Sequence, residues 1–233
     1  MRYGPLVRNL LGILAVVAIV VGPALAHYAV VPPLAGFAMF ALGGILAILV
    51  ALVSLVQLVR GRGLTLGGAL ALVAGVFFFA LMGRGRGAPR INDFTTDLDD
   101  PPTYVAAGNV PANAGRDMAY PRDFAAEQRQ CCADLHPARV AAPPAQAYER
   151  ALAVAKAMPH WEVTRADPSS GTIEVIATSE LFRFRDDVVL RVRPTPDGGS
   201  KVDVRSKSRD GKGDLGANAA RIRDVVGRIE AAK

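Results

Sequence analysis

The sequence predicts an α+β protein in which transmembrane helices precede a four-stranded antiparallel sheet packed with helices on one face. Two observations lead to this prediction. Hydrophobic residues make up 51% of the 233 residues and are concentrated in the first 82, where they form three long apolar runs. Later in the chain, apolar and polar residues alternate at the period of a strand, between segments that have helical spacing.

The apolar runs span residues 6–26, 34–59 and 64–82, and residues 1–82 are therefore expected to form a transmembrane region. Each run is about long enough to cross a hydrocarbon core of roughly 30 Å. Apart from Arg8 near the start of the first run, they contain no Asp, Glu, Lys or Arg. Transport paths usually need such groups inside the membrane, so a channel or pump is not favoured.

Basic residues between the runs predict the orientation. Arg2, Arg8 and the Arg60–Gly61–Arg62 loop would lie in the cytoplasm by the positive-inside rule. The third run then leaves the cytoplasm, which predicts a multi-pass protein of the bacterial inner membrane with a periplasmic C-terminal domain. Arg84, Arg86 and Arg90 follow the third run and favour the opposite orientation.

The first run also resembles a cleavable signal peptide, because it ends in the small-x-small sequence Ala24–Leu25–Ala26. Cleavage would leave two runs with the same cytoplasmic loop between them. Both alternatives place the C-terminal domain on the same side.

Residues 83–115 are expected to form an extended linker that wraps the domain, since they are rich in Gly, Pro and Asp and lack apolar periodicity. Their acidic cluster lacks the central glycine and closing glutamate of a calcium loop, so no metal site is predicted. A solvated turn, or a partner for a basic face, is favoured instead. The cluster consists of Asp93, Asp97, Asp99 and Asp100.

Residues 116–233 are expected to form the soluble α+β domain. Helices are predicted at 124–133, 145–158 and 214–231, and strands at 161–167, 172–180, 183–193 and 201–208. The short turns between the strands indicate an antiparallel meander. Its buried face is expected to contain Trp161, Val163, Ile173, Val175, Ala177, Phe184, Val188, Leu190, Val192, Val202 and Val204.

Charged residues are expected to meet across the opposite face of the sheet. The turn between the last two strands sets Arg193 opposite Lys201, Arg191 opposite Asp203 and Asp187 opposite Lys207. These pairings are the structural alternative to a ligand-binding surface.

The last strand and the turn after it carry the candidate site. Four cations and Asp203 occupy the alternate positions from Lys201 to Arg209, a glycine-rich turn follows, and Asp214 is placed to cap a helix. A helix start beside Lys and Arg can bind an anion. The ligand-binding residues predicted are Arg205, Lys207, Arg209, Lys212, Asp214 and Asn218. The same cations could instead pair with Asp93 and Asp97.

Asp186 is the candidate acid or base, because strand alternation turns it toward the apolar face near Ala177. A carboxylate in that position needs a backbone or cationic partner, so a capped structural residue is favoured over a general acid or base.

Other chemistry has little support in the sequence. There is no Ser-His-Asp set, HExxH, CxxC or phosphate loop, and no cofactor is predicted. Cys131 and Cys132 are adjacent, and two free thiols are expected because a ring closed between neighbours strains the peptide.

The motifs assembled so far resemble the family called domain of unknown function 1499. The matching residues are Asn92–Asp93, Thr96–Asp97, Pro101–Pro102, Tyr120–Pro121, Phe124, Gln128, Trp161–Glu162, Asp186–Asp187–Val188, the stretch from Val202 to Arg209, Gly211, Asp214, Gly216, Asn218, Arg221 and Ile222. The sequence departs from the family pattern at Cys131–Leu135, where an aromatic residue and a proline are expected. The resemblance implies an envelope or membrane setting and supplies no catalytic residues.

The function expected is that of a membrane-tethered binding or scaffold module of the cell envelope, with anionic lipid or an envelope polymer as partner. The alternative is an envelope hydrolase or transferase that uses Asp186 and the turn from Arg205 to Asp214. Nucleic acid is not an expected partner, because the polar sheet face lacks aromatic residues on which bases stack.

Overall fold

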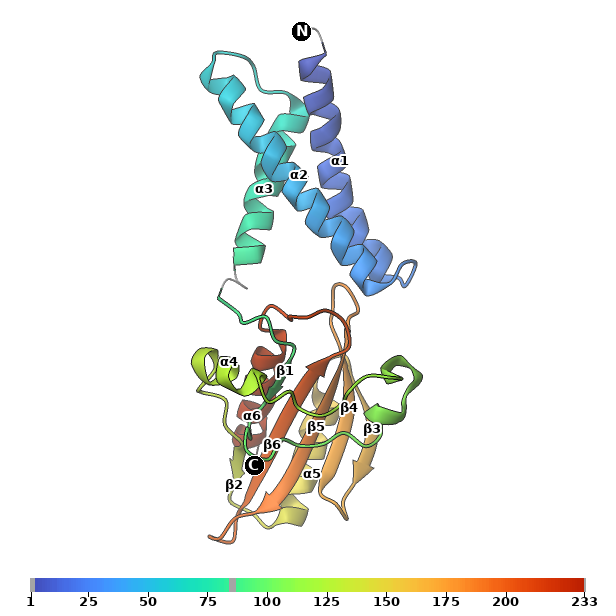
Figure 1. Ribbon diagram of the computed structural model, residues 1–233, viewed down its shortest axis with the longest axis vertical. Coiled ribbons are helices and arrows are strands. Elements are labelled where there is room, and N and C mark those ends of the chain that lie inside the picture. The colour runs from blue at the N-terminus through green and yellow to red at the C-terminus, as the bar shows by residue number, and fades with distance from the viewer. Residues whose placement is uncertain (1–2, 84–86, 233) are drawn as a thin grey trace. The chain divides into compact units, whose positions relative to one another are not determined.

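The computed structural model describes residues 3–83 and 87–232, which form two compact units (Figure 1). The first unit is helical, and the second, which begins at Gly87, is an α+β domain. Arg2, Arg84 and Arg86, which enter the orientation prediction, lie outside the described residues.

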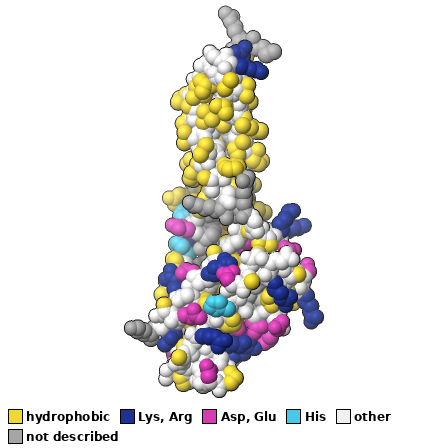
Figure 2. Space-filling model, turned by 90° about the vertical axis from the view of Figure 1, so that its left-hand side faces the viewer, with side chains coloured by type: hydrophobic (Ala, Val, Ile, Leu, Met, Phe, Trp, Pro, Cys, Tyr) yellow, Lys and Arg dark blue, Asp and Glu magenta, His cyan; other side chains and the backbone are white. Residues whose placement is uncertain are grey.

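The helical unit contains α1 (Gly4–His27), α2 (Pro33–Val59) and α3 (Leu66–Gly83), at the positions of the predicted runs. All three helices are long and apolar enough to cross a membrane. Figure 2 shows apolar side chains over the outer surface of this unit, as expected where a helix faces lipid.

Close helix packing in this unit depends on small residues. The Asn9 side-chain oxygen of α1 accepts the Gly67 N–H of α3 over 2.6 Å, and a Cβ on Gly67 would collide with the Asn9 backbone. Gly75 makes only ordinary contacts, whereas Gly63 faces open space. Of these glycines, Gly67 is the one that the helix approach requires.

The α+β unit has a sheet of six antiparallel strands, rather than the four predicted. Strands β1 (Asp93–Thr95), β6 (Ser200–Ser208), β5 (Arg185–Pro194), β4 (Thr172–Thr178) and β3 (Trp161–Asp167) follow one another across it, and β2 (Ala138–Val140) also pairs with β6. The additional strands are three residues long and use the outer edge of β6, with β1 opposite residues 205–207 and β2 opposite residues 200–202. Such short strands have no measurable period, and they form because the N–H and C=O groups along that edge need partners.

The strand register agrees with the prediction. Arg193 lies opposite Lys201, Arg191 opposite Asp203, and Asp187 opposite Lys207.

Helices α5 (Pro144–Ala157) and α6 (Ala217–Ala231) cover the apolar face of the sheet. The predicted strand residues Ile173, Val175, Ala177, Val188, Leu190, Val192, Val202 and Val204 are buried in this core, with Trp161 and Val163 packed at its margin. Phe184 is half-buried.

The short helix α4 (Phe124–Cys131) ends at the cysteine pair. Cys131 and Cys132 are joined as a disulfide, so the expectation of free thiols is wrong. Cys132 lies outside the helix, with φ at −144°. The side chains of the two neighbouring cysteines therefore need not point in the different directions that consecutive residues take on a helix.

The opposite face of the sheet is covered by residues 92–118, which we call the strap. In Figure 1 the strap crosses in front of the strands and returns toward α4. It includes β1 and two 3-10 helices, Ala107–Asn109 and Pro111–Asn113. Because the strap lies on this face, every residue from Val202 to Ser208 is buried on both sides of β6.

Candidate functional site

Arg205, at the centre of the predicted site, is 1% exposed. Its Nε and Nη2 donate to the two carboxylate oxygens of Asp93 over 2.9 and 2.7 Å. Nη1 donates to the carbonyl of Pro102 over 3.0 Å, and Nη2 to that of Met118 over 2.9 Å. Bidentate charge-assisted bonds are among the stronger protein hydrogen bonds, so Arg205 fastens both ends of the strap to β6.

Two tyrosines of the chain flank the guanidinium. Its carbon lies 4.8 Å from the ring centroid of Tyr104 and 5.5 Å from that of Tyr120. Burial raises the pKa of both phenols, which remain neutral and donate hydrogen bonds. Tyr104 donates to the carbonyl of Asp187 over 2.9 Å, and Tyr120 to the side chain of Gln128 over 3.1 Å.

Lys207 shares the same carboxylate. Its Nζ lies 3.0 Å from Oδ2 of Asp93, and the lysine is 6% exposed. Two cations therefore meet one buried anion. We call Asp93, Arg205 and Lys207 the Asp93 triad, which carries a net positive charge.

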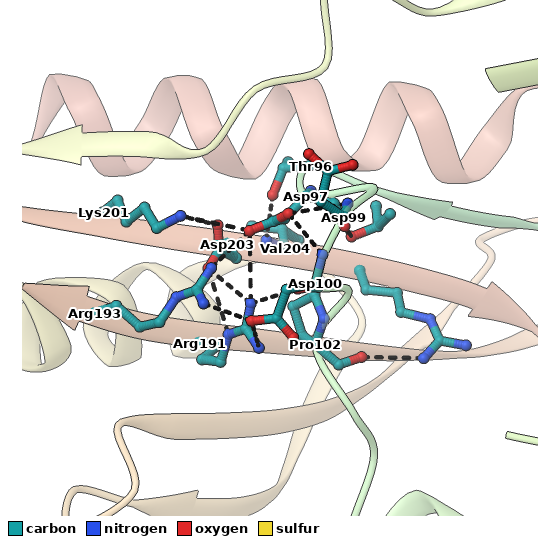
Figure 3. Close-up of polar contacts among 12 residues, drawn as sticks. Thr96, Asp97, Asp99, Asp100, Pro102, Arg191, Arg193, Lys201, Asp203 and Val204 are labelled. Atoms are coloured by element: carbon teal, nitrogen blue, oxygen red, sulfur yellow. Dashed lines mark hydrogen bonds and ion pairs between the residues drawn. The ribbon is translucent and has the colours of Figure 1, made fainter. Parts of the chain in front are cut away.

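A second set of ion pairs, which we call the charge cluster, lies further along β5 and β6 (Figure 3). Arg193 is central to it: Nη2 lies 2.6 Å from Asp97 and 2.7 Å from Asp203, and Nη1 lies 2.6 Å from Asp100. Three carboxylates and three cations balance one another. The members are Asp97, Asp100, Asp203, Arg191, Arg193 and Lys201.

Arg209 is also paired within the fold. Its Nη2 lies 2.6 Å from Oδ1 of Asp187, which is fully buried. Asn113 of the strap donates to the other oxygen of Asp187 over 2.8 Å. The strap is thus held to β5 as well as to β6.

The helix-proximal residues of the predicted site serve the start of α6. Asp214 accepts the backbone N–H groups of Gly216 and Asn218 over 2.9 and 2.6 Å, and α6 begins at Ala217, three residues later than expected. Burial raises the pKa of Asp214, although these backbone hydrogen bonds lower it in part. The side chain of Asn218 accepts from Ser206 over 2.6 Å and donates to Ser208 over 2.8 Å, and it is fully buried.

Asp186, the candidate acid or base, is ion-paired. Its Oδ2 accepts from Nη2 of Arg221 over 2.6 Å, and the aspartate is 5% exposed. The cationic partner that its position requires is therefore supplied by α6.

Lys212 differs from the other predicted ligand residues. It is exposed in the turn, and its side chain has no hydrogen bond or ion pair within the part of the chain that the structure describes. The other five all make side-chain hydrogen bonds within the domain. The pairing alternative thus accounts for Arg205 and Lys207 through Asp93, and for Arg209 through Asp187.

Two buried polar residues were not predicted to hold the strap. Gln128 of α4 accepts from Thr95 N–H over 3.1 Å and donates to its carbonyl over 2.6 Å, as a neighbouring strand would. Glu174 of β4 accepts the N–H groups of Val105, Ala106 and Ala107, each over 2.9 Å. A single charged residue on the polar face of a strand usually indicates that this face is exposed to solvent. The sequence therefore did not indicate that Glu174 is buried beneath the strap.

One pocket of about 610 Å³ opens between the strap, α4 and β6. Two exposed arginines, Arg122 and Arg129, lie at its rim, while the buried Arg205 lies at its floor. Its other lining residues are Leu98, Asp99, Pro101, Thr103, Ala119, Tyr120 and Ala125.

No group of three or more His, Cys, Asp or Glu residues within residues 3–83 and 87–232 has the arrangement of a metal site. Asp93, Asp97 and Asp100 of the strap instead form ion pairs with arginine and lysine.

A family model described as a protein of unknown function, DUF1499, matches residues 93–229, more than half of the chain. The chain belongs to the DUF1499 family. The match starts at the first residue of β1, so the DUF1499 domain includes the strap. Neither the curated proteins nor the solved structures yield a match.

The motif residues through which the chain resembles DUF1499 gather in the polar contacts described above. Asp93 pairs with Arg205, Asp187 with Arg209, and Asp186 with Arg221, while Gln128 holds β1. In this DUF1499 domain these side chains bind one another.

Proposed function

We propose that this DUF1499 protein is a membrane-tethered binding or scaffold module of the cell envelope. Its three apolar helices would anchor it in the bacterial inner membrane, and the basic loop at Arg60 favours a periplasmic position for the domain. The membrane is thus its first partner.

One observation favours a binding module over an enzyme. The charged motif residues form ion pairs within the domain, and these pairs attach the strap and α6 to the sheet. A general acid or base must be able to reach a substrate and exchange a proton with it. Asp186 instead lies 2.6 Å from a guanidinium nitrogen, and Arg209 is bound to buried Asp187. This weighs against the hydrolase or transferase alternative.

The ion pairs of Arg205, Lys207 and Arg209 also change where a ligand surface is expected. An anionic lipid or polymer at Arg205, Lys207 or Arg209 would have to compete with a buried carboxylate, leaving Lys212 as the accessible cation of the set. A single exposed lysine does not make a site, so we infer that the ligand surface is instead the pocket between the strap and α4, which is lined by the exposed Arg122 and Arg129.

The variant Asp186→Asn tests the proposed class. It should lower the melting temperature because Arg221 loses its carboxylate partner, and it should support the growth of a strain lacking the gene in proportion to the folded protein that remains. The exposed Asp224→Asn, which breaks a surface pair with Arg228, is the matched control and should leave both measurements unchanged. An Asp186→Asn protein that melts normally yet fails to complement would support the enzyme alternative.

A further inference from the structure

We propose that the pocket between the strap and α4 binds a small organic molecule that carries a carboxylate or phosphate group. The anion would lie against Arg122 and Arg129, above Arg205. This inference rests on the proposed function as a binding module and adds its ligand class.

The dimensions of the pocket suit a small molecule. Its volume of about 610 Å³ falls in the range of roughly 300–1,000 Å³ that is typical of ligand sites. The walls come from three parts of the domain: the strap contributes Pro101 and Thr103, α4 contributes Arg129, and β6 contributes Arg205. Because the Asp93 triad holds the strap on β6, the pocket is part of the rigid fold.

The rim arginines are available to a ligand. Arg122 has no ion pair among the described residues. Arg129 lies 3.9 Å from Asp99, but the two side chains are 60% and 98% exposed. Exposed pairs of this kind contribute little, so a bound anion could take the place of Asp99. A guanidinium offers two parallel N–H groups, which match the oxygens of a carboxylate or phosphate.

The floor of the pocket favours negative charge for an independent reason. The Asp93 triad places two cations against one carboxylate in a buried position, which leaves a net positive charge behind the pocket. Arg205 has five N–H groups, and four of them donate within the protein. The fifth, on Nη1, has no acceptor in the described part of the chain.

The remaining lining residues suit an organic body rather than a bare ion. Leu98, Pro101, Ala119 and Ala125 supply apolar surface, and Tyr120 supplies an aromatic ring. Thr103 adds a hydroxyl group that can bind a polar substituent. An anionic group on a ring or a short chain would use both kinds of contact.

Calorimetry on the full chain in a neutral detergent tests this proposal, with glycerol 1-phosphate and glucuronate as probes. At least one of them should bind, and the uncharged glycerol and glucose should bind about tenfold more weakly or not at all. Binding of the phosphate alone, or of the carboxylate alone, would identify the anionic group.

The variant carrying Arg122→Gln and Arg129→Gln should weaken this binding by about tenfold or more. These arginines are exposed and hold no buried partner, so the variant should keep the wild-type melting temperature. A control carrying Lys156→Gln and Arg228→Gln loses the same charge from exposed helix positions outside the pocket, and should bind as the wild type does.

Equal binding by the two double variants would overturn the proposal, and so would the absence of binding by both anions. Either result would leave the binding-module proposal standing if Asp186→Asn still complements in proportion to its folded fraction. Failure of that complementation, with anion binding intact, would instead overturn the proposed function alone.

Discussion

Arg205 has the largest side chain that is fully buried in the described structure. Burial alone would lower the pKa of a guanidinium, but the hydrogen bonds to Asp93 and the negative charge of that carboxylate raise the pKa of Arg205 above its usual value. The group therefore stays charged inside the fold. The charged form of Arg205 is stabilised by Asp93, which is also the counter-charge of Lys207.

Asp93→Asn should therefore be strongly destabilising. The amide leaves two buried cations without a counter-charge, and breaking a buried pair costs about 3–5 kcal/mol. Urea unfolding of the full chain in detergent, followed by the fluorescence of Trp161, the single tryptophan of the chain, measures this loss. Asp224→Asn at the exposed pair on α6 should change the free energy of unfolding by less than about 0.5 kcal/mol. Similar values for the two variants would contradict a central role for the Asp93 triad.

Residue identities at this site were predictable, whereas their burial was not. Alternation along β6 separates Arg205 and Lys207 from Val202 and Val204, as observed. It does not distinguish a solvated polar face from one that another part of the chain covers. Pairing of these cations with Asp93 and Asp97 was predicted only as an alternative to ligand binding. In the structure, Asp93 is the carboxylate that pairs with both Arg205 and Lys207.

The strap is the element that turns a one-sided sheet into a sheet covered on both faces. It is held by ion pairs at Arg205, by the side-chain amide of Gln128 and by the carboxylate of Glu174. Segments without regular structure need such side-chain partners, since their backbone groups cannot satisfy one another.

Asp97 makes the attachment of the strap dependent on pH. Burial raises its pKa, but the hydrogen bonds from the Asp100 N–H and from Arg193 outweigh burial and bring the pKa below its usual value. A carboxylate with a lowered pKa in the folded state stabilises the protein above the pKa of the unfolded chain, and this contribution is lost as the pH falls through the folded pKa.

Asp97→Asn should accordingly lower the free energy of unfolding by roughly 1–2 kcal/mol near pH 7. The difference from the wild type should shrink as the pH falls below the usual pKa of an aspartate and become small once the pH is below the lowered pKa of folded Asp97, because the wild-type carboxylate is then protonated. Urea midpoints from Trp161 fluorescence across this range would show the change. A difference that stays constant with pH would mean that the charge of Asp97 does not hold the strap.

Long elements were predictable because their periods repeat. Strand β3 has the predicted bounds, and the register between β5 and β6 follows from the turn between them. Strands β1 and β2 were not predictable, since three residues carry no period and both depend on the free edge of β6. The start of α6 was placed too early because Gly216, at φ +85°, separates the capping residue Asp214 from the first helical turn.

If the helical unit spans a membrane, its basic residues determine on which side the domain lies. The loop between α2 and α3 carries Arg60 and Arg62, while Arg90 lies beyond α3 and favours the opposite side. Basic residues in short loops have the strongest effect in the positive-inside rule. We therefore expect Arg60 and Arg62 to determine the orientation, with their loop in the cytoplasm.

Reporter fusions after the C-terminus test this orientation. Alkaline phosphatase, which needs the periplasm, should be active there, and a fluorescent protein that folds only in the cytoplasm should stay dark. The same reporters fused after Gly61 should behave in the opposite way. Fluorescence without phosphatase activity at the C-terminus would place the domain in the cytoplasm.

The chain is fixed to the sheet where it enters the domain, because strand β1 lies at the start of the strap. Ile91 and Phe94 are fully buried, and the carbonyl of Asn92 accepts the N–H of Ser208 over 2.8 Å. Tension applied to the chain before Ile91 would load the edge of the sheet and the ion pairs of Asp93 at the same moment. The chain can leave the sheet from this side only after β1 and the ion pairs of Asp93 have separated from β6.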